Sequence, residues 1–214
     1  MLIVFEGPEG AGKTTQLRLA AEWLTAEGRS VLAVREPGGT PLGDEIRRLL
    51  LDPQSVIGAR AEAMLFMASR AQLMDQVVRP ALARGDTVLL DRFFLSTYAY
   101  QVAGRGLPHD QVSVANRLAT AEIRPDLTIL LALPVQVGLS RALQRGPRDR
   151  MEQADAQFHE RVATAFTEFA TPAWQAAHPE AGSVRAVDAS GTPQEVFERV
   201  RDVVAGLARK FPPR

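Results

Sequence analysis

The sequence predicts an α/β protein whose core is a doubly wound parallel sheet of five strands. Short apolar segments typical of strands alternate with longer segments of helical periodicity over the 214 residues. The strand segments are apolar on both faces of the pleat, which is typical of strands buried between two layers of helices. A glycine-rich loop follows the first of them, and such sheets bind ligands at the carboxyl ends of their strands. We therefore expect one domain over residues 1–214, with its site in the loops that follow the strands.

The expected elements follow from periodicity, glycine and proline. Strands are expected at Leu2–Phe5, Ser30–Val34, Thr87–Leu90, Leu127–Leu133 and Val184–Val187. Helices are expected at Gly12–Glu27, Leu42–Leu51, Arg60–Arg84, Asp110–Ala121, Val135–Arg145, Gln157–Gln175 and Pro193–Ala208. Gly28 stands where a helix commonly ends, and Pro80 should kink or end the helix that contains it.

The composition excludes several classes of protein. Lys and Arg total 25, as do Asp and Glu, so there is no general electrostatic reason for binding nucleic acid or an anionic membrane. The absence of cysteine excludes disulfides, thiolate zinc sites and a cysteine nucleophile, and fits a reducing compartment. No segment approaches the ~18 apolar residues of a membrane span, and the first residues do not resemble a secretion signal. We expect a cytoplasmic protein that binds neither nucleic acid nor membrane.

The loop between the first strand and the first helix carries the pattern of a phosphate-binding loop. It consists of Gly7, Pro8, Glu9, Gly10, Ala11, Gly12, Lys13, Thr14 and Thr15. The glycines let successive N–H groups approach an anion, and the helix that follows adds the positive end of its dipole. Lys13 supplies a point charge for the outer phosphates, and the hydroxyl of Thr14 is a hard oxygen ligand for Mg²⁺. We therefore expect the chain to bind a nucleoside triphosphate.

Charged residues follow the second and third strands. Arg35 and Glu36 precede a turn rich in proline and glycine, and alone they indicate no more than an exposed ion pair. Asp91 ends the third strand, where P-loop enzymes place an acid near Mg²⁺, and Arg92 offers a planar fork suited to phosphate. The alternative is a structural Asp–Arg pair, which is common at such places.

Two further groupings have both a structural and a functional interpretation. Phe66 and Arg70 lie four residues apart and share a helix face. Together they could stack on and hydrogen-bond a flat base, or Phe66 could belong to the core while Arg70 lies at the surface. A run of four arginines surrounds a Gly-Pro break, at Arg141, Arg145, Arg148 and Arg150. Such a run is usually solvated, but in a triphosphate-binding protein it also fits an arginine-bearing lid, expected at about residues 141–152.

With these elements in this order, the chain resembles the bacterial thymidylate kinases, which phosphorylate dTMP. The likeness runs over nearly the whole chain. It rests on Phe5–Thr15, Arg35–Thr40, Phe66 with Arg70, Asp91–Phe93, Ser96–Gln101 and Arg124–Asp126. The phosphate loop alone is generic, whereas the Glu-Pro-Gly-Gly-Thr and Asp-Arg-Phe…Tyr-Gln elements are specific. The resemblance implies a P-loop nucleoside monophosphate kinase fold with a short lid, ATP and Mg²⁺ as cofactors, dTMP as the substrate, dTDP as the product for dTTP synthesis, and a homodimer.

The resemblance also implies how the phosphates and the metal are held. Arg92 would hold the acceptor phosphate, with Arg35 and Glu36 near the same site. Thr14 and Asp91 would hold Mg²⁺.

The remaining matches imply how the nucleoside is recognised. Phe66 would stack on thymine and Arg70 would hydrogen-bond its edge, with Thr97 and Gln101 lining the same pocket. Tyr100 would sit against the sugar and disfavour a 2′-hydroxyl. From the phosphate loop, Glu9 would reach the sugar of the acceptor.

Members of the family differ in where the catalytic arginine lies. The loop of this chain has Gly10 and no arginine, so the lid arginines Arg145, Arg148 and Arg150 are the candidates, acting with Lys13 and Arg92. The family's dimer uses helices that flank the core, a role that the alanine-rich helix at Ala59–Ala83 could fill.

Two other functions stay open at this point. One is another nucleotide kinase of the same fold, acting on dUMP, CMP or a deoxynucleoside. The other is a nucleotide-dependent switch ATPase that transfers nothing to a small acceptor. A GTPase is disfavoured, because the single asparagine, Asn116, is followed by Arg-Leu and not by the guanine-recognition pattern.

Overall fold

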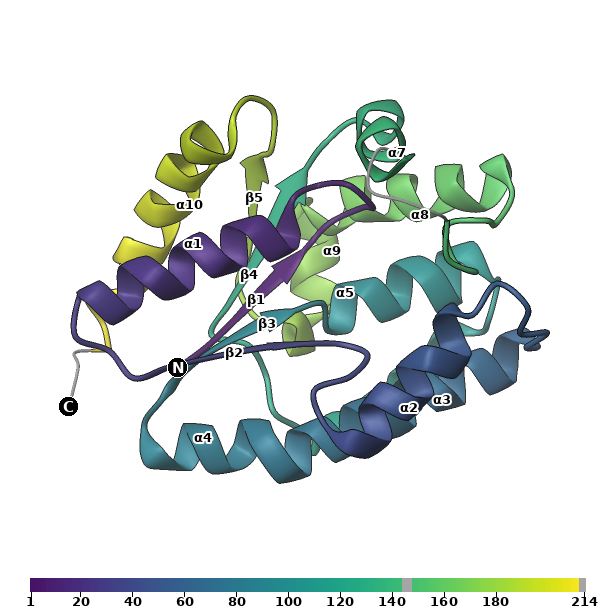
Figure 1. The fold of residues 1–214 in the computed structure, drawn as a ribbon, viewed down its shortest axis with the longest axis horizontal. Coiled ribbons are helices and arrows are strands. Elements are labelled where there is room, and N and C mark those ends of the chain that lie inside the picture. The colour runs from purple at the N-terminus through teal and green to yellow at the C-terminus, as the bar shows by residue number, and fades with distance from the viewer. Residues whose placement is uncertain (144–147, 212–214) are drawn as a thin grey trace.

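The computed structural model describes residues 1–143 and 148–211 and arranges them as a parallel sheet between two layers of helices (Figure 1). Within these residues the strands are β1 (Leu2–Glu6), β2 (Val31–Arg35), β3 (Thr87–Asp91), β4 (Leu127–Ala132) and β5 (Val184–Asp188). Their order across the sheet is β2-β3-β1-β4-β5, and every neighbouring pair is parallel. The strands and the fold class predicted from the sequence are confirmed.

The register of the central strands brings the loops of interest together. Phe5 of β1 pairs with Asp91 of β3, and Glu6 pairs with Leu130 of β4. The phosphate loop after β1 and the Asp91-Arg92 segment after β3 therefore leave the sheet side by side at its carboxyl edge.

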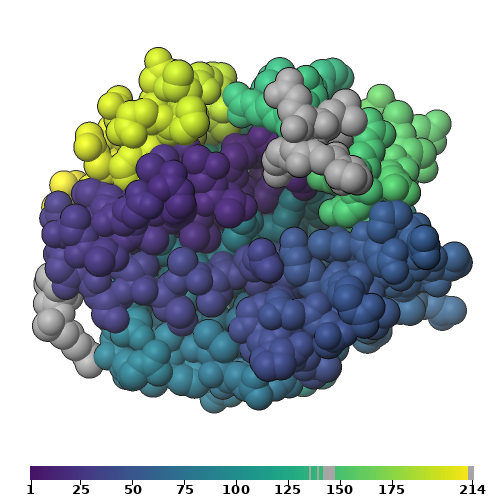
Figure 2. Space-filling model, in the orientation of Figure 1, coloured from purple at the N-terminus to yellow at the C-terminus, as the bar shows by residue number. Residues whose placement is uncertain are grey.

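Two hydrophobic cores lie on the two faces of the sheet, because successive strand residues point in opposite directions. Ile3 and Phe5 face the core that is completed by helices α1 (Lys13–Ala26) and α10 (Pro193–Ala208). Leu2 and Val4 face the other core. In the space-filling view the yellow α10 lies directly against the purple α1 (Figure 2).

Most of the remaining helical elements form the second layer or the rim of the site. They are α2 (Pro41–Leu51), α3 (Ala59–Leu73), η1 (Met74–Val78), α4 (Arg79–Arg84), α5 (Phe94–Thr97), η2 (Tyr98–Gly104), α6 (His109–Thr120), α7 (Val135–Leu143), α8 (Ala156–Phe169), α9 (Pro172–Ala177) and η3 (Pro179–Ala181). Among the described helices, none is long and apolar enough to cross a bilayer.

The helix that contains Pro80 is interrupted as expected, and the helices depart from the prediction at one other proline and in one loop. The α-helical pairing of α3 ends at Leu73, and a π-helical turn precedes Pro80, which has no N–H to donate to the preceding turn. The long helix expected at Gln157–Gln175 is two helices, because Thr171 caps a new helix that begins at Pro172. The segment after Asp91, to which the sequence analysis assigned no helix, forms α5 and the π-helical η2.

Candidate active site

The phosphate loop joins β1 to α1 and packs against the backbone of α7. Gly7, Gly10 and Gly12 have φ of 141°, 73° and 88°, a region that favours glycine. A Cβ built on Gly10 would lie 2.0 Å from the carbonyl oxygen of Gly138 in α7. Any side chain at position 10 would therefore displace one of the two segments.

Lys13 is buried at the first turn of α1 and points back into the loop. Its Nζ donates to the carbonyls of Gly7 at 3.1 Å and Pro8 at 2.8 Å. Burial, together with the positive charge of Arg92, lowers the pKa of Lys13 to about 8. These carbonyl contacts are ones that phosphate oxygens can replace.

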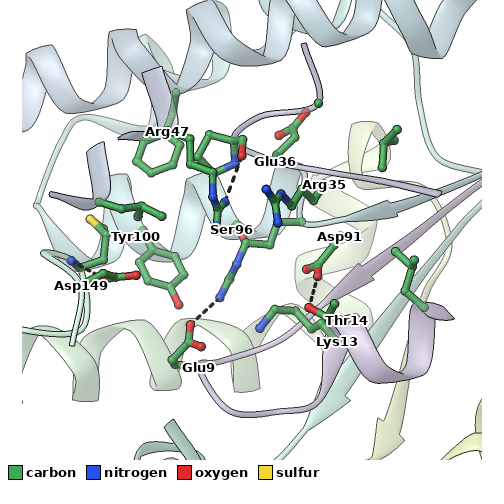
Figure 3. A pocket seen from close by; sticks show the side chains of 18 of the residues that line it. Glu9, Lys13, Thr14, Arg35, Glu36, Arg47, Asp91, Ser96, Tyr100 and Asp149 are labelled. Carbon is green, nitrogen blue, oxygen red and sulfur yellow. Dashed lines mark hydrogen bonds and ion pairs between the residues drawn. The ribbon is translucent and has the colours of Figure 1, made fainter. Parts of the chain in front are cut away.

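Thr14 and Asp91 bring two hard oxygen atoms together beside the loop. The Thr14 hydroxyl donates to Oδ2 of Asp91 at 2.6 Å, as Figure 3 shows. No group of three or more His, Asp or Glu side chains suited to a metal is present among the described residues. Mg²⁺ commonly binds through one or two protein oxygens and completes its shell with water and phosphate. The Thr14–Asp91 pair fits that donor set.

Arg92 follows β3 with a φ of 73°, a left-handed conformation that is costly for a residue with a side chain. This conformation turns its guanidinium into the site. There it donates to Oε2 of Glu9 and to Oγ of Ser96, each at 2.9 Å, and lies 5.2 Å from the centre of the Tyr100 ring. Burial raises the pKa of Tyr100 to about 12, so its hydroxyl stays neutral at physiological pH.

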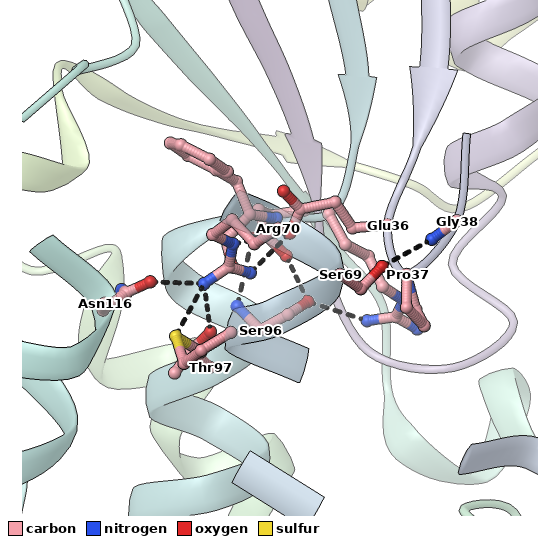
Figure 4. Close-up of polar contacts among 12 residues, drawn as sticks. Glu36, Pro37, Gly38, Ser69, Arg70, Ser96, Thr97 and Asn116 are labelled. Atoms are coloured by element: carbon pink, nitrogen blue, oxygen red, sulfur yellow. Dashed lines mark hydrogen bonds and ion pairs between the residues drawn. The ribbon is translucent and has the colours of Figure 1, made fainter. Parts of the chain in front are cut away.

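Arg70 and Glu36 form a buried ion pair in the wall of the site. Arg70 Nε donates to Glu36 at 2.7 Å, Nη2 donates to the Phe93 carbonyl at 3.0 Å, and Nη1 donates to Thr97 at 2.7 Å and to Asn116 (Figure 4). Burial raises the pKa of Glu36 despite the opposing pull of Arg70. Its Oε1 is buried and has no hydrogen-bond partner in the described part of the chain.

Most of the predicted site residues line a single cavity of about 650 Å³. From the loop and α1 these are Glu9, Gly10, Gly12, Lys13, Thr14 and Thr15, and from other elements Arg35, Glu36, Phe66, Arg70, Asp91, Arg92, Thr97, Tyr100 and Gln101. The cavity thus brings together residues from the loop after β1 and from β2, α3, β3, α5 and η2. The Glu36–Pro37 peptide bond, in the turn that closes one wall, is cis.

The three candidate lid arginines are not placed alike. Arg145 lies outside the described residues. Arg148 is exposed and Arg150 is partly buried, and neither lines the cavity. Arg150 donates instead to Glu62 and to the carbonyl of Leu50.

Three residues of the site carried no clear signal in the sequence. Glu6, fully buried at the end of β1, accepts the N–H groups of Phe93 and Ser96, at 2.7 Å and 3.0 Å, and so holds the turn that carries Arg92. Arg47 and Asp149 line the cavity. Burial and the nearby charge of Arg35 lower the pKa of Arg47. Only the carboxylate within an apolar strand, at Glu6, was a visible anomaly.

Comparison with known proteins identifies the family of the chain. The family model described as thymidylate kinase matches residues 5–190. A thymidylate kinase of Pseudomonas fluorescens is 48% identical over 94% of this chain and 98% of its own. One of Deinococcus radiodurans is 50% identical over 79% of this chain and 82% of its own. The crystal structure of thymidylate kinase from Ehrlichia chaffeensis superposes with a TM-score of 0.74 at 28% identity, covering 96% of this chain and 98% of that one. The family model thus covers most of the chain, and relatives 48–50% identical are matched over most of their own length, so the chain belongs to the thymidylate kinase family.

Proposed function

We propose that the chain transfers the γ-phosphoryl group of ATP to dTMP and releases dTDP for dTTP synthesis. The observation that carries the proposal is the shared cavity. A phosphate loop ending in Lys13, an arginine at the end of β3 and a ring beside a buried arginine on α3 all open into it. Such a cavity can hold a triphosphate and a flat base at the same time.

The acceptor needs no general base. A phosphate monoester has a second pKa near 6, so it is largely dianionic and nucleophilic at neutral pH. The obstacle is the repulsion of two polyanions, about 1 kcal/mol for each pair of unit charges at ~4 Å even in water, and more in a closed site. Catalysis should therefore depend on cations and N–H donors.

Positive charge is proposed to come from the phosphate loop, from the segment after β3 and from the lid. Lys13 and the loop amides would hold the donor phosphates, and Arg92, with Arg35 and Glu36 nearby, would hold the acceptor phosphate. Arg145 and Arg148 are proposed for the transferring phosphoryl group. Mg²⁺, held by Thr14 and Asp91, would neutralise charge on the donor phosphates.

The nucleoside would be recognised by other residues that line the same cavity. Phe66 is proposed to stack on thymine, while Arg70 and Thr97, which are hydrogen-bonded to each other and line the cavity with Gln101, are proposed to contact the edge of the base. Tyr100 and Glu9, which both contact Arg92, are proposed to contact the sugar.

We also propose that the chain forms a homodimer through α3 and α6. The two helices contact each other, and they expose Met64, Val114 and Leu118, whose exposed fractions are 61%, 58% and 83%. Large apolar side chains exposed on neighbouring helices are typical of an interface. Leu118→Glu should convert a dimer into a monomer in light scattering, whereas Val137→Glu, at an exposed residue of α7, should not. A wild-type protein that is monomeric at micromolar concentration would refute the proposal.

A panel of acceptors tests the activity itself. ATP and Mg²⁺ are supplied with dTMP, dUMP, CMP or deoxythymidine, and ADP release is followed for each. We expect dTMP to give the highest kcat/KM. A different best acceptor would assign another kinase activity, and phosphate release at the same rate without any acceptor would indicate a switch ATPase.

A further inference from the structure

A buried carboxylate behind the wall of the cavity joins three separate segments. Glu62 of α3 is fully buried and does not line the cavity. It accepts from Gln101 of η2 at 3.1 Å, from Arg105 at 3.1 and 2.9 Å, and from Arg150 at 2.8 Å. Burial alone would raise the pKa of Glu62, but the hydrogen bonds from Arg105 and Arg150 lower it below its ordinary value. Glu62 is therefore ionised at neutral pH and holds these side chains through charged hydrogen bonds.

Arg150 is held on the side of its segment that faces away from the cavity. Its Nε donates to the Leu50 carbonyl of α2 at 2.7 Å, and its backbone N–H donates to the Leu51 carbonyl at 3.0 Å. Its side chain is only 11% exposed. Its neighbours Asp149 and Met151 do line the cavity. Asp149 and Met151 thus face the cavity, while Arg150 between them binds α2 and α3 and holds the segment in place.

The segment that contains Arg150 forms a turn that is stabilised by Asp149. Oδ1 of Asp149 accepts the backbone N–H groups of Met151 and Glu152, each at 2.9 Å. Arg148 stands at the start of this turn and is exposed. The contacts of Arg150 attach this turn to α2 and α3.

We propose that Glu62 and Arg150 are positioning residues for phosphoryl transfer, which rests on the proposed function. Together they fix the turn at residues 148–152 to the wall of the acceptor pocket, and through Gln101 the same carboxylate orients a residue of that wall. Arg150 acts through Glu62 and does not touch the transferred phosphoryl group. The charge that reaches that group comes from other arginines.

A double-mutant cycle separates this role from direct catalysis. The wild type, Glu62→Gln, Arg150→Ala and the double variant are assayed for kcat and for KM with dTMP and with ATP. Each single change should lower kcat/KM for dTMP by about 10- to 100-fold, the loss expected from misplacing a site by ~1 Å. The double variant should lose no more than the worse single variant, because the two residues act as a unit. Glu62→Gln should raise KM for dTMP more than KM for ATP, since Gln101 belongs to the acceptor wall.

Two controls make the result decisive. Arg84→Ala removes an exposed arginine that is paired with Asp86 far from the cavity, and it should leave kinetics unchanged. Urea unfolding of the four proteins should show coupling between the two substitutions, which confirms the contact independently of activity.

Three results would overturn the proposal or its basis. If Arg150→Ala lost about 10³-fold or more in kcat while Glu62→Gln stayed close to wild type, Arg150 would be a phosphoryl-contacting arginine. Coupling in unfolding with unchanged kinetics would make the pair purely structural. A wild type without turnover on any acceptor would refute the proposed function, and the positioning role with it, even where the unfolding cycle showed coupling.

Discussion

Replacing Arg70 with alanine should destabilise the protein strongly, in addition to weakening the binding of dTMP. The guanidinium is the charged partner of Glu36, and the two side chains are only 3% and 4% exposed. Arg70→Ala leaves the Glu36 carboxylate buried without a counterion. It also removes the donors that now serve Thr97, Asn116 and the Phe93 carbonyl.

The expected loss is large because solvent does not screen this pair. Removing one member of a buried ion pair costs about 3–5 kcal/mol, since the remaining charge is uncompensated. For a chain of this size that corresponds to a fall in Tm of roughly 6–20 °C. An ion pair exposed to solvent contributes far less to stability, about 0–1 kcal/mol.

The loss should also depend on pH. Burial already raises the pKa of Glu36, and without Arg70 it should rise further. A carboxyl group whose pKa is higher in the folded than in the unfolded state does not destabilise the fold at a pH below its unfolded pKa, where it is protonated in both states. At a pH above its folded pKa it is ionised in both states and lowers the free energy of unfolding by the full amount. The gap in free energy of unfolding between the wild type and Arg70→Ala should therefore shrink as the pH falls from about 7 to about 5.

Urea unfolding at both pH values measures this gap, with Arg70→Ala/Glu36→Gln as the matched variant. The second substitution removes the orphaned charge and should recover more than half of the lost stability at neutral pH. It should not recover the affinity for dTMP. A loss below about 1 kcal/mol, or a gap that does not change with pH, would refute the view that Arg70 compensates a buried charge.

Three further predictions concern the phosphate loop and the sugar. Lys13→Ala should lower kcat by at least about 10²-fold with an unchanged circular dichroism spectrum, and near-wild-type turnover would exclude Lys13 from the site. The pKa of Lys13 is about 8, and the protonated amine is the form that attracts phosphate, so kcat/KM for ATP should fall as the pH rises above that value. A profile that stays flat well into the alkaline range would contradict this. Tyr100→Ala should reduce the preference for dTMP over its ribonucleotide about tenfold or more in kcat/KM, and an unchanged ratio would remove Tyr100 from sugar discrimination.

Features with a local physical cause were predictable from the sequence. The strands were predicted because their apolar runs are bounded by turn residues, and β1 and β3 were found within one residue of their observed ends. The phosphate loop was predicted because its glycines, lysine and threonine are contiguous. Asp91 and Arg92 were identified because charge at the end of a buried strand needs a reason.

Features that depend on the meeting of distant segments were not predictable in the same way. Arg150 belongs to a run of arginines, and nothing in the sequence of that run shows which arginine points toward the cavity and which one binds Glu62. Glu62 itself looks like a surface residue of a helix until η2 packs over it. The π-helical turn of η2 has no signature in periodicity, although it sets the directions of Tyr100 and Gln101.

The contact between the phosphate loop and α7 has a consequence for how this enzyme can change in evolution. A Cβ at Gly10 would meet the carbonyl of Gly138 at 2.0 Å, and a Cβ at Gly138 would meet the carbonyl of Glu9 at 2.2 Å, so the two backbones exclude side chains from each other. An arginine cannot enter the loop at position 10 unless the loop or α7 moves. A lineage that placed the proposed lid cation in the loop instead would thus have to change the backbone contact between these two segments as well as the residue itself.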